Sequence, residues 1–190
     1  MDLTSLANVK ALLESDATWG TTWDTLVGYL ITAISGEVEK FCNREFESKA
    51  RTEQHDGGGK FVYLKCPPIT KITSVKLSPI WDWAGTTAES SSNYVYEAST
   101  GMLFYIWSPW PYAEGAVQVV YEGGYANLAA LPKALEGAVC KQVAHAFRRR
   151  KDLGLENVTF PDGSIQKINT EQFLPEVKTA LLAFRRRSSR

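Results

Sequence analysis

The stretch TWDTLVGYLITAISGEVEKFCN, residues 22–43, carries the strongest hydrophobic period in the chain. Its apolar residues recur at steps of three and four, which is the spacing of one face of an α-helix. They are Trp23, Leu26, Val27, Leu30, Ile31, Ile34, Val38 and Phe41. Thr22 can cap the start, Asp24 lies where the helix dipole favours an anion, and Asn43 can end the helix. The stretch predicts one long amphipathic helix.

Three further helices are expected around it. A short helix over residues 4–13 precedes it, with apolar residues again at helical spacing. The helical period returns after Pro132 and runs to the basic group at residues 148–151. A last helix begins near Pro175, a favourable first-turn residue, and ends at the arginines of residues 185–187.

Residues 45–124 change to short alternating runs between turn residues, which is typical of β-strands. Strands are expected at residues 51–55, 61–65, 72–77, 94–97, 102–105 and 116–121. The glycine run at residues 56–59 predicts a hairpin turn that joins the first two. Long loops are expected at residues 78–93 and 106–115, and a small hairpin at residues 158–166.

The order of elements contains no repeated βαβ unit and predicts an α+β fold. We expect a bundle of about four helices with an inserted, mostly antiparallel β region. Residues 1–190 then form a single domain, with residues 1–44 and 133–190 as its helical part and residues 45–124 as the β insertion.

The 21 basic and 21 acidic residues of this 190-residue chain cancel, which argues against a polycation that coats nucleic acid. Residues 1–132 hold 9 Lys and Arg against 15 Asp and Glu, whereas residues 133–190 hold 12 against 6. The division indicates either opposite faces for different partners or a solvated helical end rich in arginine. No targeting signal or membrane-length apolar run is found, so a cytoplasm-like compartment is expected.

No catalytic residue, cofactor or metal site is predicted. His55 and His145 belong to no recognisable motif, and the glycine run lacks the GxxxxGK[ST] pattern of a phosphate-binding loop. Cys42, Cys66 and Cys140 are widely separated, so they are expected to be buried free thiols. Without a partnered histidine, the carboxylates of residues 37–53, including Glu53, are interpreted as surface charge.

Two groups of residues are candidates for contacts with partners. Trp107, Trp110 and Tyr112 lie among prolines and are either interface anchors or a small core over the end of the sheet. The basic groups either complement helix dipoles or contact phosphates or an acidic protein surface. They comprise Arg148, Arg149, Arg150, Lys151, Arg185, Arg186, Arg187 and Arg190.

An ordered set of short motifs spans most of the chain. It resembles the head-tail connector proteins of long-tailed bacteriophages, also called adaptor or head-completion proteins. The motifs are Leu3-Thr4, Val9-Lys-Ala-Leu12, Phe41-Cys-Asn-Arg44, Phe46, Thr52-Glu53, Asp56-Gly-Gly58, Leu64, Pro67-Pro-Ile69, Ile72-Thr-Ser-Val75, Gly101-Met-Leu103, Val119-Val-Tyr-Glu-Gly-Gly-Tyr125, Pro132, Ala138, Ala144 and Arg148-Arg-Arg150.

The resemblance implies a non-enzymatic virion protein of the neck, made in the host cytoplasm, that binds no cofactor and no membrane. It implies a homo-oligomeric ring, usually twelve-fold, that extends the DNA channel below the portal protein and receives a stopper or tail-completion protein. Non-specific contact with genomic DNA is expected in the channel. The segment of residues 174–190 is the candidate portal-docking arm, with Leu174, Val177, Leu181 and Phe184 as its apolar residues.

The two long loops depart from the family pattern, so contacts there are not carried over from it. Two alternatives stay open from the residues themselves. One is a DNA-binding regulatory or packaging-associated protein, which would show affinity that falls steeply with salt. The other is a small hydrolase or transferase, which would need a site built around His55 or His145.

Overall fold

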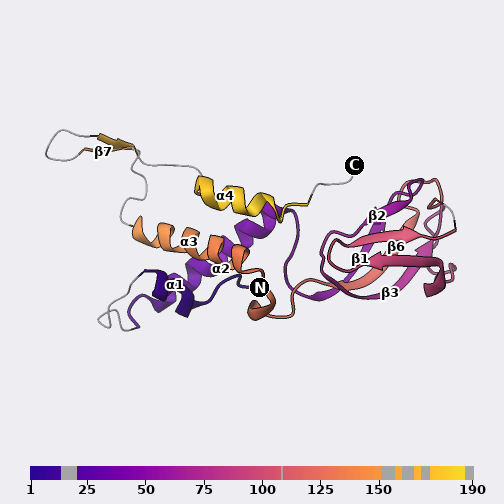
Figure 1. Ribbon diagram of the computed structural model, residues 1–190, viewed down its shortest axis with the longest axis horizontal. Helices are drawn as coiled ribbons and strands as arrows, with labels where there is room; N and C mark the ends of the chain where they lie inside the picture. The colour runs from indigo at the N-terminus through magenta and orange to yellow at the C-terminus, as the bar shows by residue number, and fades with distance from the viewer. Residues whose placement is uncertain (14–20, 108, 151–156, 160–164, 168–171, 187–190) are drawn as a thin grey trace. The chain divides into compact units, whose positions relative to one another are not determined.

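The computed structural model describes residues 1–13, 21–107, 109–150, 157–159, 165–167 and 172–186, the side chains of 157–159 and 165–167 excepted. The chain divides into two compact units. The helical unit contains Met1–Asn43 and Leu131–Arg190, and the β unit contains Arg44–Ala130. Figure 1 shows helices in the first and two small sheets in the second, as expected for an α+β fold.

The helical unit contains, within its described residues, α1 (Leu6–Leu12), α2 (Asp24–Cys42), α3 (Lys133–Arg148) and α4 (Pro175–Leu182) (Figure 1). Helix α3 packs against the other three. Its Leu135, Val139 and Val143 recur at helical spacing and are buried against the apolar faces of α2 and α4. The unit also carries the expected hairpin, formed by β7 (Asn157–Thr159) and β8 (Ile165–Lys167).

The ends of the helices follow local signals with one exception. Asn43 ends α2 in the left-handed conformation, with φ 51°, and Pro175 occupies the first turn of α4. The expected cap of α2 by Thr22 is wrong, because Trp23 is its N-cap residue and makes no capping hydrogen bond with its side chain. The Trp23 ring instead meets the edge of Phe147 on α3, with centroids 5.9 Å apart. Packing between helices therefore sets this helix start.

The β unit contains β1 (Lys49–His55), β2 (Phe61–Tyr63), β3 (Ile69–Leu77), β4 (Tyr94–Glu97), β5 (Met102–Tyr105) and β6 (Val117–Gly123). They form two antiparallel three-stranded sheets, ordered β1-β6-β3 and β2-β5-β4. The predicted hairpin between the first two strands is wrong, because β1 and β2 belong to different sheets.

The glycine run between β1 and β2 supports the loop that follows β5. Gly57 N–H donates to the Ala113 carbonyl at 3.0 Å, and Gly58 N–H donates to the Trp110 carbonyl at 2.8 Å. A Cβ atom on Gly57 would lie 1.6 Å from the Pro111 carbonyl oxygen. Gly57 is therefore needed because another backbone approaches closely, and Gly58 because its φ of 88° is in the left-handed region; neither forms a hairpin between β1 and β2.

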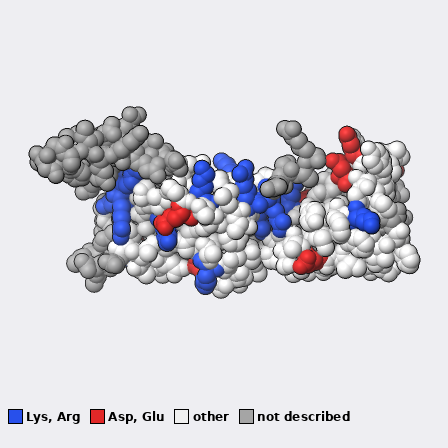
Figure 2. Space-filling model, turned by 45° about the horizontal axis from the view of Figure 1, so that its top comes forward, with Lys and Arg blue, Asp and Glu red and all other residues white. Residues whose placement is uncertain are grey.

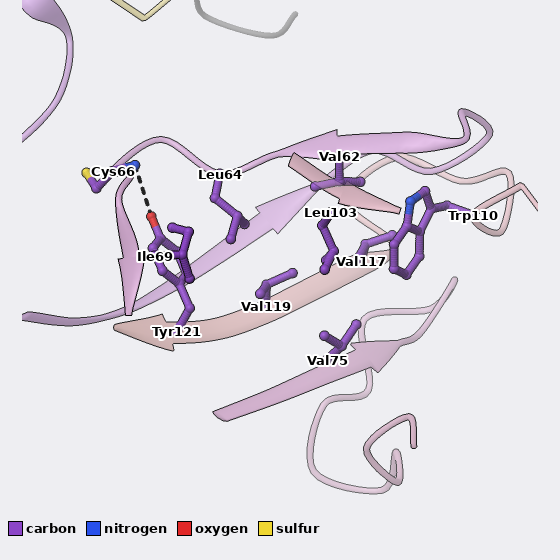
Figure 3. Close-up of a cluster of buried hydrophobic side chains, with 10 residues drawn as sticks. All are labelled: Val62, Leu64, Cys66, Ile69, Val75, Leu103, Trp110, Val117, Val119 and Tyr121. Carbon is purple, nitrogen blue, oxygen red and sulfur yellow. Dashed lines mark hydrogen bonds between the residues drawn. The ribbon is translucent and has the colours of Figure 1, made fainter. Parts of the chain in front are cut away.

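The core of the β unit lies between its two sheets. Figure 3 shows Val62 and Leu103 from one sheet facing Val117, Val119 and Tyr121 from the other. Val75 and Ile69 complete the cluster from β3, and Leu64, Cys66 and Trp110 from the connecting segments. The three cysteines are buried and free, as expected.

Candidate interaction surfaces

The basic group at the end of α3 contains residues with different surroundings. Arg148 is exposed, whereas Arg150 stacks on Phe147 and Trp23, its guanidinium carbon 4.1 and 4.7 Å from the ring centroids. Its Nη1 also donates to the Phe147 carbonyl at 2.9 Å. Arg150 therefore holds the end of α3 against the start of α2. Arg149 is half-buried, and Lys151 lies outside the described residues.

The basic group after α4 is attached to the other end of α2. The Arg185 guanidinium lies over the Phe41 ring, 5.5 Å from its centroid. Arg186 N–H donates to the Cys42 carbonyl at 2.9 Å. Arg187 and Arg190, the other candidates in this group, lie outside the described residues.

The two basic groups consequently lie at opposite ends of the helical unit. One contacts Trp23 at the start of α2, and the other contacts Phe41 and Cys42 in its last turn. Helix α2 has 19 residues, which at about 1.5 Å per residue separates the groups by roughly 28 Å. The helical unit therefore offers two separate basic surfaces to its partners.

The charge division seen along the sequence does not coincide with the folded units. The helical unit combines 14 basic with 12 acidic residues, and the β unit 7 with 9. Figure 2 shows Lys and Arg side chains along the helical unit with a few acidic ones among them. Ion pairs such as Lys133 with Glu136, at 2.7 Å, account for part of this mixing. Neither unit carries a large net charge, so the basic residues stand out only as local groups.

The apolar residues of the candidate docking arm are used within the helical unit. Val177 and Leu181 are buried there, and Leu174 and Phe184 are half-buried. Gln142 of α3, which sequence reasoning missed, fastens the start of α4: its Oε1 accepts from Leu174 N–H at 3.0 Å, and its Nε2 donates to the Gln172 carbonyl at 3.1 Å. In this state Leu182 is the exposed apolar residue of α4, and Arg185 after it is exposed as well.

The aromatic loop after β5 divides between the two interpretations left open. Trp110 is 1% exposed and belongs to the core, so its assignment as an interface residue is wrong for the described state. Its ring packs on Tyr105, with centroids 4.8 Å apart. Trp107 and Tyr112 are 75% and 96% exposed. Only these two are free to anchor a partner.

Two residues that sequence reasoning missed join them. Ile80 and Trp81, in the loop after β3, are strongly exposed. The Trp81 Nε1 donates to the Glu114 carbonyl at 2.9 Å, which fixes this loop against the one that carries Tyr112. The group Ile80, Trp81, Trp107 and Tyr112 is called the aromatic tip below. It lies at the end of the β unit where β1 and β3 end and β6 begins, away from the segments that join the helical unit.

Glu53, expected to be surface charge, is instead a hydrogen-bond acceptor whose side chain is only 10% exposed. Its carboxylate accepts from the Tyr121 hydroxyl at 2.5 Å and from Lys65 N–H at 3.1 Å, and lies 3.0 Å from His55 Nε2. Burial raises the pKa of Glu53, but the hydrogen bonds from His55, Tyr121 and Lys65 outweigh burial and hold the pKa below its usual value. Burial, and then Glu53, raise the pKa of Tyr121. The network closes the polar side of the β core.

His145 lies half-buried on α3 beside Lys141 and Arg148, in a shallow groove that also includes Leu12 and Leu174. Burial, and then Arg149, lower its pKa. Among the described residues no group of His, Cys, Asp and Glu could hold a metal ion. None of the described helices has the length and apolarity that crossing a membrane requires.

The fold defines a class, that of α+β proteins with a helical unit and a β unit. Its notable surface features are exposed aromatic and basic side chains. The model of the head completion protein family matches residues 2–187. The chain belongs to that family, and the expected role as a structural head-tail connector is confirmed for it at that level. A search of curated proteins found no match.

Solved structures share the fold across nearly the whole chain. One is titled the neck of a native GTA particle computed with C12 symmetry. It is 14% identical in sequence to this chain and superposes with a TM-score of 0.56, and the match covers 100% of this chain and 96% of the other. A second is titled the virion of a native gene transfer agent (GTA) particle. Its sequence identity is 17% and its TM-score 0.59, and the match again covers 100% of this chain and 96% of the other. A third is titled the neck of an empty GTA particle computed with C6 symmetry. Its sequence identity is 13% and its TM-score 0.59, and the match covers 98% of this chain and 91% of the other.

Proposed function

We propose that the chain is the subunit of a ring in the neck of a phage-like particle, between portal protein and tail, where it extends the DNA channel. The observation that carries the proposal is the family match over residues 2–187, which includes both units. The solved neck with C12 symmetry that shares this fold supports a twelve-fold ring. The work of such a subunit is assembly, so no chemical step is assigned to it.

The separation of the surfaces supports a division of labour in the ring. The end of α4 and the segment after it form the portal-docking surface in this proposal, with Leu182 as the exposed apolar residue and Arg185 and Arg186 as the basic ones. The aromatic tip receives the stopper or tail-completion protein, because exposed Trp and Tyr are frequent interface anchors. Arg148 and Arg149 are the candidates for contact with DNA phosphates. They lie at the end of α3, near the start of α2 and so away from the docking surface.

The test combines native mass spectrometry with electron imaging of the chain alone and mixed with the portal protein. Rings that form alone or on the portal are expected. The double variant Arg185→Glu/Arg186→Glu should lose portal binding, and the matched variant Arg148→Glu/Arg149→Glu should retain it. A stable dimer that binds short duplex DNA and never forms rings would contradict the proposal. Equal portal binding by the two variants would remove only the docking assignment.

A further inference from the structure

The sheet β2-β5-β4 has a largely apolar outer face. Val62 and Leu103 pair in register and point into the core (Figure 3). Because side chains alternate along a strand, Phe61 and Tyr63 point to the opposite face. Phe104, which pairs with both Phe61 and Val95, lies on that face too. The Phe61 and Phe104 rings are in contact, with centroids 5.5 Å apart. Ile106 continues the ladder beyond β5, since its N–H donates to the Asn93 carbonyl at 2.9 Å. Met102 and Glu97 lie in the row of Tyr63, so one acidic side chain stands at the edge of this face. The group Phe61, Tyr63, Val95, Phe104 and Ile106 is called the outer aromatic face.

The other sheet of the same unit provides an internal comparison. Its outer face consists of cross-strand rows in which Gln54 pairs with Gln118, and Thr52 with Val120. Lys76 and Ser74 of β3 extend these rows. That face has the polar pattern of a sheet side in contact with water. The outer aromatic face departs from this pattern, so its composition is that of a covered surface.

The exposed area is large enough to matter. Phe61 is 48% exposed, and Tyr63 and Val95 are each 56% exposed. With Ile106 these side chains leave roughly 350 Å² of apolar surface, since a fully buried aromatic accounts for about 200 Å². One side of a standard interface buries about 800 Å², of which slightly more than half is apolar. The face supplies most of the apolar share of one such interface.

We propose that a second copy of this chain covers the outer aromatic face. The inference rests on the proposed ring, because a closed ring gives every subunit two different side surfaces that neighbours must cover. Every copy carries the same apolar face, and its area fits one side of a standard interface. The aromatic tip, in contrast, stays available for a protein outside the ring.

The first test measures whether the face is covered in the ring. The native cysteines are buried, so an introduced thiol reports on its own position. Val95→Cys places it on the outer aromatic face with little change of volume, and Thr52→Cys places it on the polar outer face of the other sheet. Maleimide labelling of Val95→Cys should be at least about tenfold slower in the ring than in the free subunit, since interface cores pack like interiors. Labelling of Thr52→Cys should be unchanged.

The second test uses a matched pair of substitutions. Tyr63→Lys puts a charge on the outer aromatic face and should abolish ring formation. Tyr112→Lys makes the same change on the aromatic tip and should leave rings intact. Circular dichroism on both free subunits verifies that they are folded.

Four results would overturn the inference. Rings of Tyr63→Lys, or equal labelling of Val95→Cys in ring and free subunit, would overturn it and leave the proposed function standing. Slow labelling of Val95→Cys already in the free subunit would show that the chain covers its own face. Failure of the unaltered chain to form any ring would overturn both this inference and the proposed function.

Discussion

At the scale of single residues, the chain uses several chemically conspicuous side chains for its own folding. Arg150 lies over two aromatic rings, Trp110 fills the β core, and Glu53 accepts hydrogen bonds inside the β unit. Their neighbours Arg148 and Trp107 remain exposed. The distinction between structural and contact residues therefore lies within each motif and not between motifs.

The Glu53 network predicts a specific cost for Tyr121→Phe. Loss of the hydroxyl removes a donor to Glu53 and the acceptor of Cys66 N–H, which it meets at 3.2 Å. We expect the free energy of unfolding to fall by about 2 kcal/mol, because buried polar groups lose their partners. Urea unfolding measures it. The control Tyr105→Phe, which loses one hydrogen bond to Glu89 at 3.3 Å, should cost less than about 1 kcal/mol. Equal costs would contradict the role of the network.

The two tryptophans of the aromatic loop should behave in opposite ways. Trp110→Ala should lower the free energy of unfolding by about 3–5 kcal/mol, because it empties a large volume in the core. Trp107→Ala should change it by less than about 0.5 kcal/mol, because the side chain is exposed. Thermal unfolding followed by circular dichroism checks both. A large effect of Trp107→Ala would indicate that this residue is part of the fold.

At the scale of elements, glycines show where the backbone is constrained. Gly57 lies where the loop after β5 approaches closely, whereas a Cβ on Gly137 of α3 would have no atom within 4 Å. Packing requires the first glycine. At the second, alanine would fit and would stabilise the helix more than glycine does.

Alanine at these two positions should therefore have effects of opposite sign. Gly137→Ala should raise the free energy of unfolding by up to about 1 kcal/mol, the difference in helix propensity. Gly57→Ala should lower it by more than about 1 kcal/mol, because the loop must move from Pro111. The urea midpoints of the two variants make the comparison. Destabilisation by Gly137→Ala would mean that the exposed side of α3 is more constrained than its surroundings indicate.

Elements with strong local signals could be predicted from the sequence. The bounds of β4 and β5, the start of α4 at Pro175 and the end of α2 at Asn43 agree with the expectation. Partners of strands could not be predicted, because β1 pairs with β6, more than 60 residues away by register, and a glycine run beside β1 resembles a hairpin turn.

The buried polar residues were missed for a related reason. The side of β1 that faces inward carries Glu53 and His55, so alternation of apolar and polar residues gives no sign that it is buried. The partners that make this burial favourable include Tyr121, from a distant strand, and Lys65, beyond the next strand. Trp107 and Trp110 likewise lie in the same loop, so the local sequence does not show which of them is buried. The glycines that hydrogen-bond to the Trp110 backbone lie about 50 residues earlier.

At the scale of the whole molecule, each unit has its own core and its own acid-sensitive groups. His145 belongs to the helical unit and Glu53 to the β unit. The pKa of each is lower in the folded state than its ordinary value. The unfolded chain therefore binds more protons than the folded one as the pH falls below the ordinary pKa, and stability declines.

Acid should consequently weaken the units in different ranges. The helical unit should lose stability as the pH falls below about 6.5, and the β unit below about 4.5. His145→Gln should remove the first dependence. Glu53→Gln should reduce the second without abolishing it, because the hydrogen bond from Lys49 also lowers the pKa of Glu45 in the same unit. Hydrogen exchange measured against pH resolves the units separately. A dependence in the helical unit that survives His145→Gln would assign it to another group.

The β unit enters and leaves the chain through adjoining segments. Ser48 N–H donates to the Tyr125 carbonyl at 3.0 Å, and Tyr125 N–H donates to the Phe46 carbonyl at 2.7 Å. The two crossings are thus about one strand spacing apart, roughly 5 Å. The β unit has the geometry of an exchangeable cassette: a foreign module with adjoining termini could replace it without lengthening the chain between Asn43 and Leu131. In the proposed ring, exchange of this one cassette would change the surface offered to the tail, while the helical scaffold stays the same.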